Sequence, residues 1–197
     1  AHPASGIALA PLMHGASWWY GCIMMLAGNK LVLNHNRSLN GEQVWDIVER
    51  EKLNLVQIVG DAMAIPLLDA LKTNPGRWDL TSVFNIGSGG AVFSESKQQE
   101  FKKAFPNCFI TNAFGSSESG QMGSDSGKKK DGDESSGLGN VAKSPFMDVI
   151  IVEAEGAPRH AKPGETGIFS RSGYIPRGYD NDAKKTAETF IQVDGKT

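Results

Sequence analysis

Several features that would place a protein in a specialised class are scarce in this 197-residue sequence. It has only two cysteines, Cys22 and Cys108, which lie far apart and outside any CxxC motif. This disfavours a disulfide scaffold and favours reduced, intracellular thiols. The four histidines show no paired spacing of metal ligands, so we expect no zinc site. Lysine and arginine total 20 against 22 acidic residues, and this lack of a basic excess argues against nucleic-acid binding.

Long apolar runs are also missing. The most apolar stretch, residues 18–27, is too short to span a bilayer and fits a buried helix. The N-terminus lacks the charged and apolar regions of a signal peptide. We therefore expect a cytoplasmic protein without a transmembrane segment. Because 40% of the residues are hydrophobic and 21% are charged, the composition is that of a globular protein with an ample core.

Helix-like and strand-like segments alternate over residues 1–113. This alternation predicts an α/β fold, a parallel sheet covered by helices in three layers. We expect Asp61 and Ser94 to be N-caps and Gly28 to end the first helix. In such sheets, ligands bind outside the carboxyl ends of the strands. The expected helices are 15–28, 39–52, 61–73 and 94–105, and the expected strands are 30–34, 55–60, 82–90 and 108–115.

The composition changes after about residue 116. Residues 124–137 form a cluster of glycine, serine and charge that predicts a solvated loop. Beyond it the pattern predicts a smaller, incomplete β-barrel-like subdomain, with domains at 1–138 and 139–197. Because the sequence opens on an apolar segment without an initiator Met and stops at a hairpin turn, we expect a piece of a longer protein. The expected elements are strands at 147–153 and 167–172, a helix at 181–190 and the first strand of a hairpin at 191–197.

One polar strand end is "GSGGA", residues 87–91. Consecutive glycines let a ligand approach the backbone closely and bond its exposed N–H and C=O groups. The pattern is not a dinucleotide fingerprint, because Val92 occupies the position of the third glycine, and no Lys-Ser or Lys-Thr follows to make a P-loop. The alternative interpretation is a tight turn into the helix that Ser94 caps.

The other polar strand end is "NAFGSSESG", residues 112–120, which holds a single carboxylate, Glu118. Hydroxyls and a carboxylate beside a strand end can bind a phosphate and its Mg²⁺ ion, and Phe114 can stack on a flat ring. The alternative is a polar loop whose glutamate favours a helix start. His14 has two interpretations as well, as a pocket residue or as a capping residue beside an apolar helix.

The sequence contains, in this order, the segments "PLMHG" (11–15), "GSGGA" (87–91), "NAFGSSE" (112–118) and "GETG…SGYIPRGYDND…KTAETF" (164–190). Together they resemble the adenylate-forming superfamily, which includes acyl-CoA synthetases, luciferases and peptide-synthetase adenylation domains. The resemblance covers essentially the whole chain, is weakest at 121–145 and is closest to bacterial fatty-acyl-CoA synthetases. It implies that a carboxylic acid is activated with ATP to an acyl-adenylate, with release of pyrophosphate, and that the acyl group then passes to coenzyme A.

The resemblance also implies a role for each site residue. The backbone of 88–91 and Phe114 would sandwich adenine, and Asn112 would bond its amino edge. Ser117 would contact the α-phosphate and Glu118 would hold Mg²⁺, which makes these two the candidate catalytic residues. The implied ATP- or AMP-binding set is Ser88, Gly89, Gly90, Ala91, Asn112, Ala113, Phe114, Gly115, Ser116 and Ser117. The implied acyl pocket comprises His14, Gly15 and Gly87.

The sequence departs from the family pattern in ways that bear on function. Ser117 stands where the family has Thr, which keeps the hydroxyl and loses a methyl that stiffens the rotamer. Amino-acid-activating relatives carry an Asp near His14-Gly15, so its absence favours a non-amino acid. The phosphate loop, the ribose-binding element and the C-terminal catalytic Lys are not within the 197 residues, so we expect this chain alone to be inactive and to bind ATP weakly.

Two alternatives to an acyl-CoA synthetase are open. One is another adenylate-forming enzyme, such as an aryl or amino-acid ligase. The other is a non-catalytic binding module on the same fold. The sequence leaves open the acyl chain length, the oligomeric state and peripheral membrane association through a lipid substrate.

Overall fold

The computed structural model describes residues 3–125, 146–153 and 157–195. The chain divides into two compact units. Unit 1 comprises Ala1–Phe114 with Gly123–Val141, and unit 2 comprises Gly115–Met122 with Ala142–Thr197. Apart from its first two residues, the expected loop at 124–137 lies outside the described residues. The domain limits 1–138 and 139–197 stay a prediction.

A six-stranded sheet has the strand order β2-β1-β3-β4-β5-β6. Most of it lies in unit 1, whereas Gly115–Met122, from the end of β5 into β6, belong to unit 2. The pairs β1–β2, β1–β3, β3–β4 and β4–β5 are parallel, as the alternation of helices and strands predicts. β1 and β6 were not expected from the sequence. β1 is four buried residues between β2 and β3, and so short an apolar run carries no period. The strands are β1 Ser5–Ala8, β2 Lys30–Leu33, β3 Leu55–Ile58, β4 Asn85–Gly89, β5 Phe109–Ser116 and β6 Gly120–Asp125.

Four helices connect these strands, close to their expected limits. Gly28 follows the first helix with φ +69°, the left-handed conformation that ends helices. The expectation for Asp61 was wrong: the third helix begins one residue earlier, and Asp61 accepts a hydrogen bond from the backbone of Ser94 instead. Ser94 is an N-cap by position, without a side-chain capping bond. The helices are α1 Gly15–Leu26, α2 Gly41–Glu51, α3 Gly60–Thr73 and α4 Glu95–Ala104.

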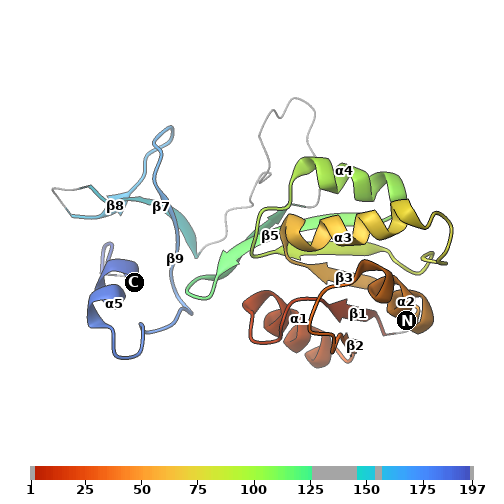
Figure 1. Ribbon diagram of the computed structural model, residues 1–197. Coiled ribbons are helices and arrows are strands. Elements are labelled where there is room, and N and C mark those ends of the chain that lie inside the picture. Colours follow the sequence, from red (N-terminus) through yellow and green to blue (C-terminus); the bar gives the residue numbers. More distant parts are fainter. Residues whose placement is uncertain (1–2, 126–145, 154–156, 196–197) are drawn as a thin grey trace. The chain divides into compact units, whose positions relative to one another are not determined.

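Helices lie on both faces of the sheet, which confirms the three layers. Buried side chains of α2, α3 and α4 form one hydrophobic cluster with the strands, and Figure 1 shows α3 and α4 side by side on that face. Ile7 of β1 points into this cluster, whereas its neighbour Gly6 faces Tyr20 of α1. Successive strand residues point to opposite faces, so α1 covers the other face.

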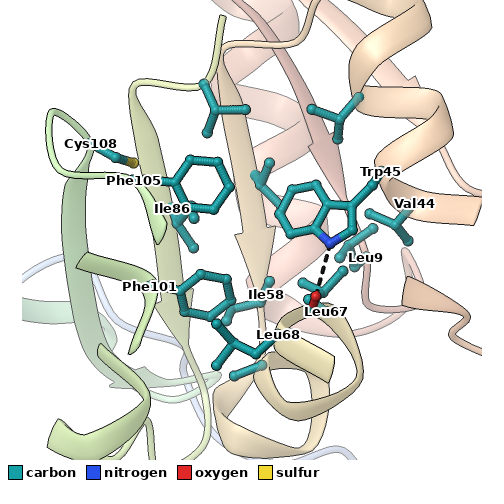
Figure 2. Close-up of a cluster of buried hydrophobic side chains, with 14 of the residues drawn as sticks. Leu9, Val44, Trp45, Ile58, Leu67, Leu68, Ile86, Phe101, Phe105 and Cys108 are labelled. Carbon is teal, nitrogen blue, oxygen red and sulfur yellow. Dashed lines mark hydrogen bonds between the residues drawn. The ribbon is translucent and has the colours of Figure 1, made fainter. Parts of the chain in front are cut away.

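The centre of this core is aromatic. Trp45 of α2 is fully buried, and its indole N–H donates to the carbonyl of Leu67 in α3 at 2.9 Å (Figure 2). The Trp45 ring packs 5.7 Å from that of Phe105, centroid to centroid, and Phe105 lies 6.4 Å from Phe101. These contacts fasten α2, α3 and α4 to one another above β3 and β4, and β4 ends in the polar segment 87–91.

Unit 2 holds a three-stranded antiparallel sheet in the order β8-β7-β9 and one short helix. The helix, α5, is capped by the carboxylate of Asp182, which accepts from the N–H of Lys185 at 2.9 Å. Of the hairpin strand and turn expected at 191–197, the strand was wrong over the residues described there, because only Val193 makes an isolated bridge, whereas Asp194 and Gly195 do form a turn. The elements are β7 Met147–Ile151, β8 Arg159–His160, β9 Ile168–Arg171 and α5 Ala183–Thr189.

Candidate active site

The carboxyl ends of β4 and β5 lie side by side in unit 1. Ser88 is paired with Asn112 and Gly89 with Ala113 in a parallel register. Ser88 and Asn112 are the two buried polar residues at these ends, 1% and 7% exposed. The pairing confirms that "GSGGA" and "NAF" meet at one edge of the sheet, where parallel α/β folds bind their ligands.

The N-terminus of α3 holds the segment that follows β4. The hydroxyl of Ser88 accepts from the N–H of Gly60 at 3.0 Å, and the N–H of Asp61 donates to the carbonyl of Val92 at 2.9 Å. Gly60 has φ +59°, and a Cβ there would lie 2.5 Å from the carbonyl oxygen of Val92. The segment is therefore a tight, fixed turn, and its residues Gly90 and Ala91 are exposed. Such a turn is compatible with close approach of a ligand to the backbone.

The same turn lies beside the start of α1. Gly90 has φ +89°, and a Cβ at this position would be 3.0 Å from Cε1 of His14. His14 is also the N-cap of α1, because its Nδ1 accepts from the N–H of Ala16 at 3.3 Å. The structure thus brings His14 to the 87–91 segment while giving it a capping bond. Gly15, next in sequence, lies near Trp19, because a Cβ on Gly15 would be 3.6 Å from the indole ring.

Gly87 is covered by a side chain that the sequence did not single out. A Cβ on Gly87 would lie 2.6 Å from Oε1 of Gln57, so the Gln57 side chain lies against Gly87 and a larger residue there would displace its flexible end. Gln57 and Gly87 are register partners in β3 and β4. In the sequence, Gln57 is one polar residue within a strand, and no local pattern indicates that it lies against Gly87.

The turn at 115–120 belongs to unit 2. A Cβ on Gly115 would lie 2.1 Å from the carbonyl oxygen of Gly120, so only glycine fits there. The hydroxyls of Ser116 and Ser119 each accept from the backbone N–H of the other, at 3.1 and 3.2 Å. Ser117 is exposed within this turn. The serine-rich composition is therefore partly explained by the turn itself, which was one of the two interpretations of the segment.

Glu118 accepts a hydrogen bond from the hydroxyl of Tyr179. This bond is the main cause that holds the pKa of Glu118 below its ordinary value, with further contributions from its own backbone N–H, the Ser116 hydroxyl and the Lys185 charge. Glu118 is consequently a carboxylate at neutral pH. Sequence reasoning missed Tyr179, which lies in the conspicuous "RGYDND" string but 61 residues from its partner.

A magnesium ion fits Glu118 in one particular way. Among the residues that the structure describes, no group of three or more His, Cys, Asp or Glu side chains gathers to hold a metal. Mg²⁺ is commonly bound by one or two carboxylates together with substrate phosphates rather than by a protein cage. A single ionised, partly exposed carboxylate therefore suits a metal that arrives with a nucleotide.

The fold and these strand ends agree with a family assignment. The family model of the AMP-binding enzymes matches residues 4–179, so the chain belongs to the AMP-binding enzyme family. Among residues in the described ranges, no helix is long and apolar enough to cross a membrane.

The relatives found by sequence are acyl-CoA ligases. A medium/long-chain-fatty-acid–CoA/3-oxocholest-4-en-26-oate–CoA ligase of Mycolicibacterium smegmatis is 34% identical over 190 residues, 95% of this chain and 33% of the relative. A 3-oxocholest-4-en-26-oate–CoA ligase of Rhodococcus rhodochrous is 34% identical over 191 residues, with the same coverage. The chain thus spans about a third of the length of the curated relatives it matches.

Solved structures with lower identity support the fold. A long-chain-fatty-acid–CoA ligase from Archaeoglobus fulgidus has a TM-score of 0.76 at 18% identity and covers 94% of this chain and 37% of that one. The O-succinylbenzoate–CoA synthetase of Bacillus subtilis, solved with ATP and magnesium, has a TM-score of 0.71 at 18% identity, with coverage of 98% and 37%.

Proposed function

We propose that this chain is the central part of an acyl-CoA synthetase, which activates a carboxylic acid with ATP to an acyl-adenylate and transfers the acyl group to coenzyme A. The observation that carries the proposal is the parallel pairing of Ser88 with Asn112, which puts the two polar strand ends of the family side by side. The named ligases at 34% identity support a large fatty or sterol side-chain acid as the substrate class.

The first step joins two anions, a carboxylate and the α-phosphate, so it depends on positioning and charge neutralisation. In this proposal the 88–91 backbone and Phe114 enclose adenine, and the Asn112 amide bonds its amino edge. The Ser117 hydroxyl contacts the α-phosphate, and Glu118 holds Mg²⁺. When bound, the metal would neutralise phosphate charge.

The acyl side of the proposal rests on His14, Gly15 and Gly87. Segment 11–15 contains no carboxylate that could pair with a substrate ammonium, which favours a fatty or sterol acid over an amino acid. Peripheral attachment to a membrane through a lipid substrate, and a cytoplasmic location, belong to the same proposal. The chain by itself is expected to be inactive and to bind MgATP only weakly, which calorimetric titration measures directly.

The test is ATP–pyrophosphate exchange by the complete enzyme that carries this chain, scanned over fatty, sterol, aryl and amino acids. We expect exchange with fatty or sterol acids. Exchange with an aryl or amino acid alone would support the other ligases, and none with any acid would support a binding module.

A substitution then tests the site. Glu118→Ala is expected to lower exchange by more than about 100-fold, because even outer partners of a metal site cost about 10–100-fold. Glu165→Ala is the matched control, since Glu165 pairs with Arg159 elsewhere in unit 2. Equal exchange by the two variants would contradict the assignment of Glu118.

A further inference from the structure

The string 174–190 is the most specific part of the sequence to which no chemical role has been given. Tyr179 from this string donates its hydroxyl to one carboxylate oxygen of Glu118, and both residues belong to unit 2. A carboxylate has two oxygens with about four acceptor sites, so one phenol leaves capacity for a cation. The bond therefore orients Glu118 without blocking it.

The surroundings of Tyr179 hold its phenol in place. Its backbone N–H donates to the hydroxyl of Thr186 at 2.9 Å, and that hydroxyl donates to the carbonyl of Asp182 at 2.7 Å. The Tyr179 ring meets the Phe190 ring edge-on at 6.0 Å, and the ammonium of Lys185 lies 4.2 Å from its centroid. Because contacts hold the backbone of Tyr179 and both the edge and the face of its ring, the side chain has little rotational freedom.

Glycine at 178 is part of this arrangement. A Cβ there would lie 2.5 Å from Cγ2 of Thr186, and the φ of Gly178 is +152°. Any larger residue would push Thr186 away from the backbone of Tyr179. The Gly-Tyr pair and the threonine of "KTAETF" thus form one local structure that presents a phenol.

The backbone around Glu118 is held from a different element. Nη1 of Arg171, in β9, donates to the carbonyls of Ser119 and Gln121 at 2.9 and 3.0 Å. The turn that carries Glu118 is therefore tied by its backbone to β9 and by its side chain to the segment before α5.

We propose that Tyr179 is a positioning residue, which orients the Glu118 carboxylate for the metal of a bound MgATP, with Thr186 holding Tyr179 in turn. The proposal rests on the function proposed above. It gives the "GYDNDAKKTAETF" segment a task in the reaction although none of its side chains needs to touch the nucleotide.

The test compares Tyr179→Phe with Tyr174→Phe, the same substitution in the same string at a side chain that is 94% exposed. In the complete enzyme, binding of Mn²⁺ together with ATP is followed by electron paramagnetic resonance. We expect Tyr179→Phe to weaken Mn²⁺ binding about 10–100-fold, the usual effect of losing an outer partner of a metal ligand. Adenylate formation by Tyr179→Phe should recover at high Mg²⁺, and Tyr174→Phe should match the wild type.

Two further variants separate positioning from damage to the fold. Thr186→Val should shift Mn²⁺ binding in the same direction by a smaller factor, and Thr186→Ser should restore it, because only the hydroxyl is used. In the 197-residue chain, urea unfolding of Tyr179→Phe, Glu118→Gln and the double variant should be non-additive, as expected of residues in contact.

Each contrary result has a distinct meaning. Unchanged Mn²⁺ affinity in Tyr179→Phe, in an enzyme whose wild type binds Mn²⁺ and ATP, overturns the positioning role. Additive unfolding in the double-mutant cycle overturns it whatever the enzyme does. If the wild type binds no Mn²⁺ with ATP while the cycle remains non-additive, the proposed function fails and the contact is merely structural.

Discussion

The two units of this chain are each stabilised by a different kind of interaction. Unit 1 encloses a continuous cluster of buried aliphatic and aromatic side chains from four strands and three helices. In unit 2, the buried hydrophobic residues among those described are Met122, Ile150 and Val193. Its folded form depends instead on polar contacts, such as those of Arg171 and Tyr179. Unit 1 is a scaffold whose rigidity comes from packing, and unit 2 holds the turn that carries Glu118 by hydrogen bonds.

This difference predicts how each unit tolerates change. Apolar burial contributes roughly 25 cal/mol per Å² and is distributed over many residues, so damage to it destabilises the whole unit. A hydrogen bond contributes on the order of 1 kcal/mol, so its loss acts locally. Substitutions in unit 1 should lower global stability, whereas those in unit 2 should loosen the Glu118 turn.

The largest effect is expected from Trp45→Ala. It empties the centre of the unit 1 core and removes the bond to Leu67, so the free energy of unfolding should fall by about 3–5 kcal/mol. Urea unfolding measures this change. Trp18→Ala is the control, because Trp18 is 55% exposed and should change stability by no more than about 0.5 kcal/mol. Similar losses for the two variants would contradict the view that buried packing stabilises unit 1.

Gly60→Ala tests the packing that supports the 87–91 segment. Both Gly60 and Gly28 have positive φ, but only Gly60 has backbone within 3 Å of an added Cβ. Gly60→Ala should therefore cost about 1–3 kcal/mol more than Gly28→Ala, the usual cost of overpacking. Thermal unfolding of the pair measures the difference. If Gly60→Ala and Gly28→Ala lost equal stability, the backbone of Ala91 and Val92 would have to shift at little cost in free energy.

Arg171→Met tests the polar organisation of unit 2. It removes the donor to the carbonyls of Ser119 and Gln121, so the local opening free energy of the turn should fall by about 1.5 kcal/mol. Amide hydrogen exchange at 117–121 should accelerate about tenfold, with unit 1 unaffected. Arg177→Met, at an exposed site, is the control. Faster exchange throughout unit 1 would contradict the local character of this bond.

The smallest effect concerns the exposed pair of Glu165 and Arg159. The Arg159 guanidinium, 2.8 Å from the carboxylate, and the N–H of Lys162 lower the pKa of Glu165 to about 2. A depressed carboxyl pKa adds stability above the unfolded value of roughly 4.3, and this contribution is lost as pH falls toward 2. NMR titration should show the low midpoint, and Arg159→Met should raise it toward the ordinary range, with the Lys162 N–H still lowering the pKa of Glu165. A midpoint unmoved by Arg159→Met would exclude the ion pair as the cause.

Much of the fold could be predicted from the sequence, because helical and strand periods are local. The helix around Val44, Ile47 and Val48 follows from residues a few positions apart. β1 could not be predicted, because four buried residues have no readable period. Asp61 failed as an N-cap because Gly60, with its left-handed φ, already begins the helix and leaves the carboxylate to Ser94.

The candidate site divides in the same way. The order of "GSGGA", "NAFGSSE" and the 164–190 string determined the family, since each motif is a local arrangement of residue types. Only the tertiary structure decided which residues meet: Gln57 over Gly87, His14 beside Gly90, and Tyr179 on Glu118. The physical reason is that strand register and loop packing bring together residues as far apart in the sequence as His14 and Gly90, and no local pattern encodes such a distance.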